Sequence, residues 1–284
     1  MFSSAHQERA DALLELRRYP EALTECLHAI ASEPEDPYNH YCLTRCHLGM
    51  DNTEEALKAA SRIIELAPQW APGYYILSLA LYANKNFAGE LETAEHAVSL
   101  DPESPPLLER LASAQMQSGL IRQAKDTARQ LLELDPESVT THSVIASISI
   151  ELQEWDVALK HIDIVLNEEP DNLQYLNDLG RIHIGRKEWK QAREVFHRAL
   201  KIDPSNEAVR DNLKMAIDSS LSGGDYGLDK KEKREDLPAE LDMLIQDTED
   251  RKSASERMFG GYLPAVLVLL LLIILTWIFS LMGY

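Results

Sequence analysis

The chain has 284 residues, and its 47 Asp and Glu against 28 Lys and Arg give a formal net charge of −19. So acidic a chain disfavours nucleic acid and anionic lipid surfaces as partners and favours basic or apolar ones, although the charge would equally keep a long chain soluble. The three cysteines, Cys26, Cys42 and Cys46, are too few for a disulfide framework and are typical of a reducing compartment.

The first residues lack the basic and then apolar regions of a signal peptide, so we expect the N-terminal part to stay in the compartment where it is made. Up to residue 204 the chain is organised by prolines that recur every 34 residues. These are Pro34, Pro68, Pro102, Pro136, Pro170 and Pro204. A fixed period of this length indicates one supersecondary unit that is copied and stacked.

Other positions recur with the prolines, and most of them hold small or aliphatic residues. Twelve residues before each proline stand Ala22, Ala56, Glu90, Ala124, Ala158 and Ala192. Twenty-four before stand Ala10, Thr44, Ser78, Ala112, Ala146 and Gly180. Five before stand Ala29, Ile63, Ala97, Leu131, Val165 and Ala199. This spacing predicts two closely packed helices in each unit, and the second helix should end before the proline, which lacks an N–H and restricts its predecessor.

Period and pattern together resemble the tetratricopeptide repeat family over residues 3–204. The resemblance implies an all-α fold, a right-handed superhelix of six helix-turn-helix repeats with a capping helix. Two residues depart from the family pattern: Glu90 at a usually small site, and Arg9 at a usually aliphatic one, as expected in a terminal unit whose outer face is wet.

The predicted units follow the prolines without a gap. They are residues 3–34, 35–68, 69–102, 103–136, 137–170 and 171–204. Residues 205–217 are predicted to form the capping helix, with Val209, Leu213 and Ile217 on its apolar side.

Residues 218–261 are predicted to be a flexible linker of mixed charge, because the repeat pattern stops there and Ser and Gly cluster at its start. Inside it, four apolar residues recur at helical spacing: Leu237, Leu241, Leu244 and Ile245. They predict a short helix at 237–246, which we expect to be only partly formed because it is short and surrounded by acidic residues.

Residues 262–282 are predicted to be a transmembrane helix. From Leu263 to Met282 no residue is charged, and fourteen of these twenty are Leu, Ile, Val or Phe. Twenty helical residues span about 30 Å, the thickness of one hydrocarbon core. A buried core helix is the alternative, but nothing in the repeats requires so uniformly apolar a partner.

Three basic residues precede this span, Arg251, Lys252 and Arg257, and no basic residue follows it. The positive-inside rule therefore predicts that the N-terminal domain faces the cytoplasm. Because only two residues follow the span, the chain resembles a tail-anchored, single-pass membrane protein. The membrane would be the bacterial inner membrane, or the endoplasmic reticulum in a eukaryote.

The sequence lacks the motifs that indicate an enzyme, including the zinc-protease, P-loop, nucleophile-elbow and dinucleotide-binding patterns. The nearest approach to a metal cluster is His40, Cys42, Cys46 and His47, but Cys46 holds an offset otherwise occupied by Ala and Ile, which favours core packing. His161 shares no carboxylate or cysteine with the other histidines of the second helices, and we expect it to be a surface or half-buried residue. We predict no catalytic residue, no metal and no cofactor.

The family resemblance places ligands on the concave wall built from the first helix of each unit. The matching positions here form an aromatic and aliphatic patch with one arginine. Its residues are Tyr38, Tyr41, Arg45, Leu48, Tyr75, Leu79, Tyr82 and Met116. Tyrosines suit a seat for a peptide or helix, whereas in a tightly wound superhelix neighbouring units would bury them. The family's clamp for chaperone carboxyl termini is absent, since its sites carry Gln7, Asp11, Cys42, Pro72 and Ile76.

We interpret the chain as a membrane-anchored, cytoplasm-facing adaptor or scaffold that binds a peptide or helix of a partner protein and no nucleic acid. Two alternatives stay open. One is an assembly factor or holdase-type chaperone for membrane proteins, suggested by the apolar patch. The other is a structural scaffold that associates with itself as a homo-oligomer.

Overall fold

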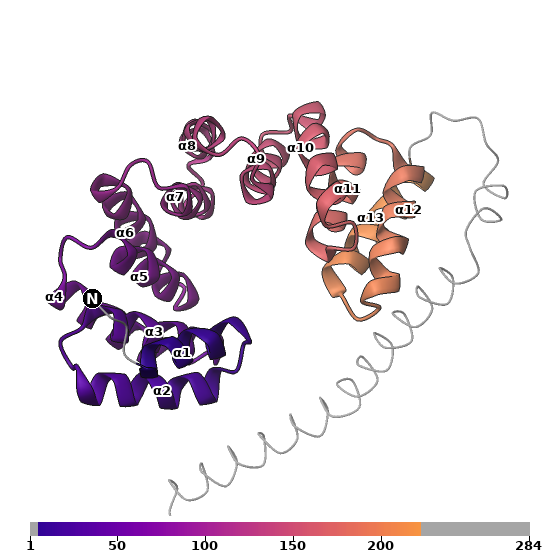
Figure 1. Cartoon of the computed structure of the whole chain (residues 1–284). Helices are drawn as coiled ribbons and strands as arrows, with labels where there is room; N and C mark the ends of the chain where they lie inside the picture. The colour runs from indigo at the N-terminus through magenta and orange to yellow at the C-terminus, as the bar shows by residue number, and fades with distance from the viewer. Residues whose placement is uncertain (1–4, 223–284) are drawn as a thin grey trace, which may run out of the picture. The chain divides into compact units, whose positions relative to one another are not determined.

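The computed structural model describes residues 5–222, and this part of the chain is an all-helical superhelix of thirteen helices without a strand (Figure 1). The first helices of the units are α1 (Ala5–Glu15), α3 (Pro37–Gly49), α5 (Ala71–Ala83), α7 (Pro105–Gln117), α9 (Val139–Glu151) and α11 (Leu173–Gly185). The second helices are α2 (Tyr19–Ser32), α4 (Thr53–Leu66), α6 (Phe87–Leu100), α8 (Ile121–Leu134), α10 (Trp155–Glu168) and α12 (Trp189–Ile202). The last helix is α13 (Glu207–Ser222).

The proline ladder sets the ends of the second helices. Every one of them ends two residues before a ladder proline, for example at Leu66 before Pro68. The residue between the two, such as Ala67 with φ −141° and ψ 72°, has left the helical region, as the restriction on a residue that precedes proline requires. The predicted two-helix unit is thereby confirmed.

The turn between the two helices of each unit contains one residue with a left-handed backbone. These residues are again 34 apart, and φ lies between 56° and 73° at all of them. They are Arg17, Asp51, Lys85, Gly119, Gln153 and Lys187. Only Gly119 is a residue for which this conformation carries no steric cost, so five turns are held in place by the packing of the helices on either side.

The small residues of the pattern lie in the core. The residues 12 and 24 before each proline are all buried, and so are the residues five before it. Close approach is clearest at Gly180, where a Cβ atom would lie 2.2 Å from Cε1 of the buried Phe196 ring. The predicted role of these offsets in helix packing is therefore confirmed.

From α1 to α12, contacts join each helix to its neighbours in the chain, and the first helices also contact one another. Thus α1 contacts α3, α3 contacts α5, and the series continues through α7 and α9 to α11. Figure 1 shows α1 to α12 following one another along an arc. Because the first helices are joined in this way, they form one continuous layer, which we call the inner wall.

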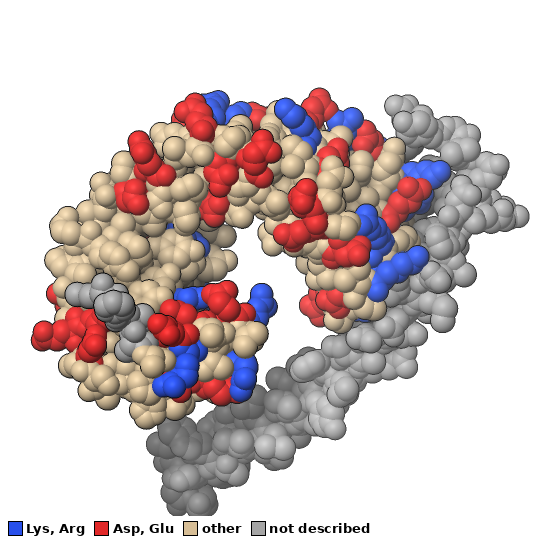
Figure 2. Space-filling model, in the orientation of Figure 1, with Lys and Arg blue, Asp and Glu red and all other residues tan. Residues whose placement is uncertain are grey.

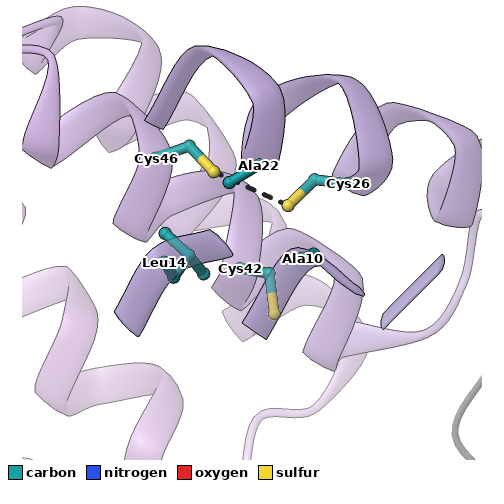
Figure 3. Close-up of a cluster of buried hydrophobic side chains, with 6 residues drawn as sticks. All are labelled: Ala10, Leu14, Ala22, Cys26, Cys42 and Cys46. Carbon is teal, nitrogen blue, oxygen red and sulfur yellow. Dashed lines mark hydrogen bonds between the residues drawn. The ribbon is translucent and has the colours of Figure 1, made fainter. Parts of the chain in front are cut away.

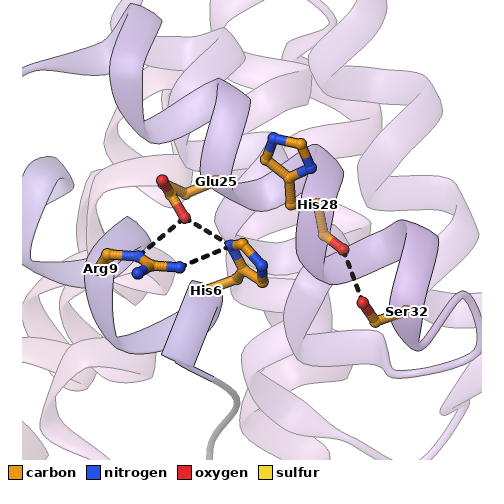
Figure 4. Close-up of polar contacts among 5 residues, drawn as sticks. All are labelled: His6, Arg9, Glu25, His28 and Ser32. Carbon is orange, nitrogen blue, oxygen red and sulfur yellow. Dashed lines mark hydrogen bonds and ion pairs between the residues drawn. The ribbon is translucent and has the colours of Figure 1, made fainter.

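The first unit shows how the array begins. Arg9, at the usually aliphatic site, donates from Nε to Oε2 of Glu25 at 3.1 Å, and His6 Nδ1 lies 2.7 Å from the same oxygen (Figure 4). The hydrogen bond with His6, and then that with Arg9, holds the pKa of Glu25 below its ordinary value. The departure from the family pattern is therefore accommodated by a polar contact between α1 and α2.

The three cysteines meet in the core of the first two units (Figure 3). Their thiols are free, and Sγ of Cys26 lies 3.6 Å from Sγ of Cys46. Hydrogen bonding with Cys42 and Cys46 raises the pKa of Cys26, so its thiol stays protonated and packs as a small apolar group. Within residues 5–222, no three side chains among His, Cys, Asp and Glu are grouped to hold a metal ion.

On α13, the residues predicted for the apolar side, Val209, Leu213 and Ile217, are buried. None of the helices from α1 to α13 combines the length and the apolar character that crossing a bilayer requires. The predicted transmembrane helix at 262–282 and the predicted short helix at 237–246 both lie outside the described residues.

Candidate protein-binding surface on the inner wall

The predicted patch begins on α1 and α3, where polar contacts tie its first residues down. The Tyr38 hydroxyl donates to Oδ2 of Asp11 at 2.8 Å, and Arg45 donates to Oε1 of Glu15 at 3.0 Å. The Tyr38 ring also stacks on the ring of Tyr41, with centroids 5.9 Å apart. Burial raises the pKa of Tyr38, and the hydrogen bond with Asp11 raises it further. The side chains of Tyr38, Tyr41 and Arg45 are therefore held in place by contacts within the chain itself.

Aromatic and aliphatic contacts continue the wall onto α5. The edge of Trp70 meets the ring of Tyr41 at a centroid distance of 5.7 Å, and burial raises the pKa of Tyr41. Leu48 and Leu79 are half-buried and pack against the cluster around Ile63. These three members of the predicted patch therefore expose one side and support the core with the other.

The last two tyrosines differ in exposure. Tyr75 is half-buried against the cluster of Ala71, Ala97 and Leu107, and this burial raises its pKa. Tyr82, the last residue but one of α5, exposes 43% of its surface. It is the most accessible aromatic side chain of the predicted patch.

Met116 is separated from the tyrosines. It lies half-buried on α7 against a cluster that contains Ala112, Ala124 and Ile148. The residues of the predicted patch thus pack against different core clusters: Tyr41, Leu48 and Leu79 against one, Tyr75 against a second and Met116 against a third. Whether these residues bind a ligand stays a prediction.

A buried ion pair beside Tyr82 was not predicted. Glu90 on α6 is fully buried, and Arg110 on α7, whose side chain is only 11% exposed, forms a salt bridge with it. The Arg110 guanidinium also lies over the Tyr82 ring, 5.1 Å from its centroid. A carboxylate at a small, buried offset signals that a cation is required, and that signal is present in the sequence. The repeat pattern does not indicate which cation pairs with Glu90, and the partner Arg110 lies 20 residues later, in the next unit.

A second pair corrects the expectation for His161, which is buried, with 8% of its surface exposed, rather than half-buried or at the surface. Its Nδ1 atom lies 2.9 Å from Nδ1 of His142, so one ring donates to the other between α9 and α10. Burial, and then the neighbouring His142, lowers the pKa of His161. The offsets of the repeat hid this pairing because the two residues occupy different positions in the period.

The histidine pair predicts that acid destabilises the array. Because the folded-state pKa of His161 is lowered, the unfolded chain binds a proton more readily, and stability falls as the pH drops below the ordinary histidine pKa of about 6.5. The melting temperature should therefore be lower at about pH 5.5 than at about pH 7.5, by about 2–4 °C for each kcal/mol lost in a domain of this size. Thermal unfolding followed by circular dichroism, for the full chain and for His161→Gln, measures the melting temperature at each pH. An equal change of melting temperature with pH in the two proteins would show that His161 is not the cause.

Comparisons with known proteins agree with this geometry. Models of the tetratricopeptide repeat match residues 45–105, 105–138 and 173–206. The structure is similar to PilW, a widely conserved type IV pilus biogenesis factor (TM-score 0.65, 13% identity), over 73% of this chain and 96% of PilW. It is also similar to PilF of Pseudomonas aeruginosa (TM-score 0.63, 15% identity), over 74% of this chain and 96% of that one.

A third solved structure is YrrB, described as a tetratricopeptide repeat protein with an unusual peptide-binding site. The TM-score is 0.50 at 17% identity, over 66% of this chain and 97% of YrrB. Among curated proteins, none matches the chain in sequence. At these identities the likeness to the three solved structures is one of fold.

Proposed function

We propose that this array of tetratricopeptide repeats is a membrane-anchored adaptor whose inner wall holds a peptide or helix of a partner protein. The tetratricopeptide repeat is a protein-interaction scaffold, and it is typically not an enzyme. Among the similar structures, YrrB is described by its peptide-binding site and PilW by its part in pilus biogenesis. Both descriptions support a partner that is itself a protein.

The observation that carries the proposal is the set of aromatic side chains on α3 and α5, in which the rings of Tyr38, Tyr41 and Trp70 contact one another and the ring of Tyr82 is exposed near the other end of α5. Tyrosine offers a large contact area at a small cost in side-chain entropy, and such rings dominate the energetics of protein interfaces. Tyr38 and Tyr41 are already held by their neighbours, so less entropy would be lost when a partner binds.

The membrane part of the proposal rests on the sequence of residues 262–282, which is apolar and long enough for one span. The basic residues before it support a repeat array that faces the cytoplasm. Tethering would raise the concentration of a bound partner at the membrane, and this requires no catalysis.

The proposal is tested by placing a photo-crosslinking amino acid at Tyr82 of the full chain in cells, with a matched control at Leu27 on α2. Leu27 is 52% exposed and lies on a second helix, away from the inner wall. We expect one stoichiometric protein adduct at Tyr82 and none at Leu27, in a membrane fraction that resists carbonate washing.

Other outcomes separate the alternatives. Many adducts rich in apolar segments would favour the assembly factor or holdase, and an adduct with a second copy of the chain would favour the self-associating scaffold. Equal labelling at both positions would show that the partner does not bind specifically at the inner wall. Release of the full chain by carbonate washing would show that the chain is not anchored in the membrane.

A further inference from the structure

The inner wall carries more carboxylates than cations. On the first helices, acidic side chains lie beside or between the residues of the predicted patch and its continuation towards α11. They are Asp11, Glu15, Glu109, Glu151 and Asp178. Figure 2 shows acidic side chains on the hollow side of the arc as well as on its outside.

Two arginines of the wall, Arg45 and Arg181, do not balance these charges, because each is shared by two carboxylates. Arg45 lies 3.0 Å from an oxygen of Glu15 and 3.8 Å from one of Asp11. Further along the wall, Arg181 lies 2.8 Å from an oxygen of Glu151 and 3.3 Å from one of Asp178. Each cluster therefore keeps an excess of one negative charge after its cation is counted.

Glu109 stands at the same repeat offset as Tyr41 and Tyr75, one unit further along the wall. Among residues 5–222 no cation forms an ion pair with it, because its neighbour Arg110 is paired with the buried Glu90. Glu109 is itself half-buried, and burial, followed by the charge of Asp135, raises the pKa of its carboxyl group. A positive charge from outside the chain would relieve both effects.

We propose that the inner wall selects a lysine- or arginine-bearing segment of a partner protein, with one cation on Glu109 and apolar side chains against Tyr75 and Tyr82. This rests on the proposed function and names the chemistry of the partner. The two kinds of surface on the wall suit the two parts of such a segment. The carboxylates attract its cation by charge, and the tyrosine rings offer contact area to its apolar side chains.

The test uses the full chain in discs of neutral lipid and three short fluorescent peptides that share two phenylalanines and differ in carrying lysines, glutamines or glutamates. Fluorescence anisotropy, with empty discs as the blank, gives the affinities. We expect the lysine peptide to bind most tightly and to weaken as salt is added. Glu109→Gln should weaken it about fivefold, the effect of about 1 kcal/mol. The matched control Glu133→Gln, at an exposed carboxylate of the second helix α8, should leave it unchanged.

The remaining outcomes are distinguishable. If the glutamine or glutamate peptide binds as tightly as the lysine peptide, and Tyr82→Ala weakens the binding of all three, the proposed preference for a cation is wrong. The proposed function, peptide binding at the inner wall, is then still supported. The preference is also wrong if the two Gln variants weaken the lysine peptide equally, since the effect is then one of overall charge. If no peptide binds while circular dichroism shows an intact helical array, both this inference and the proposed function are overturned.

Discussion

Replacing Arg110 by methionine should lower the free energy of unfolding by about 3–5 kcal/mol, because it leaves a buried carboxylate without its cation. Glu90 is fully buried at a site where the other units have alanine, and Arg110 from the next helix is its salt-bridge partner. The side chains are 11% and 0% exposed for Arg110 and Glu90, and this burial lowers the pKa of Arg110. Denaturant unfolding of the full chain, followed by circular dichroism, measures the loss.

The second arm of this experiment removes both charges. Glu90→Ala restores the residue found in the other units, and with Arg110→Met it should bring stability back to within about 1 kcal/mol of the original protein, since replacing a whole buried pair is often neutral. A double variant as unstable as Arg110→Met alone would show that the arginine acts through its packing on Tyr82 instead. The distance of 5.1 Å between guanidinium and ring makes that a real alternative.

Gly180→Ala should destabilise the array by about 2 kcal/mol, although alanine is the better helix former by about 1 kcal/mol. The added Cβ atom would lie 2.2 Å from Cε1 and 2.4 Å from Cζ of Phe196. That ring is fully buried, so it cannot turn into solvent to make room. Thermal and denaturant unfolding of the full chain give the change in stability.

The same substitution has the opposite sign when the ring is absent. In a Phe196→Ala background, itself less stable by about 3–5 kcal/mol, Gly180→Ala should stabilise by about 1 kcal/mol through helix propensity. The sign change isolates the contact between the two residues from the general preference for alanine. Destabilisation in both backgrounds would mean that the backbone at Gly180, and not the ring, requires glycine.

Helix boundaries and core positions could be predicted because they depend on local chemistry repeated six times. Each ladder proline follows the end of a second helix, and small residues such as Ala56 and Gly180 recur where the two helices of a unit touch. The left-handed turns could not be predicted, since Arg17 and Lys85 are not residues that favour a positive φ. The packing of the helices on both sides imposes that conformation.

The candidate surface was predictable in position but not in exposure. The repeat offsets place Tyr41 and Tyr82 on the same wall. The ring of Tyr41 is in contact with Trp70, whereas 43% of the surface of Tyr82 is exposed. Such differences arise from which side chains the neighbouring unit supplies, and these vary from one unit to the next. The same is true of His142 and His161, whose pairing crosses two different offsets.

The left-handed residues are spaced by one full period, so the chain passes through the same local backbone at each of them. A deletion that joins Lys85 directly to Leu120 would remove one whole hairpin and leave a junction of native geometry, because Gly119 precedes Leu120 in the same turn conformation. A cut whose length is not a multiple of 34 residues would rotate every downstream helix away from its partner. The array can therefore be shortened or extended in whole steps, each of which moves the far end of the wall by one hairpin.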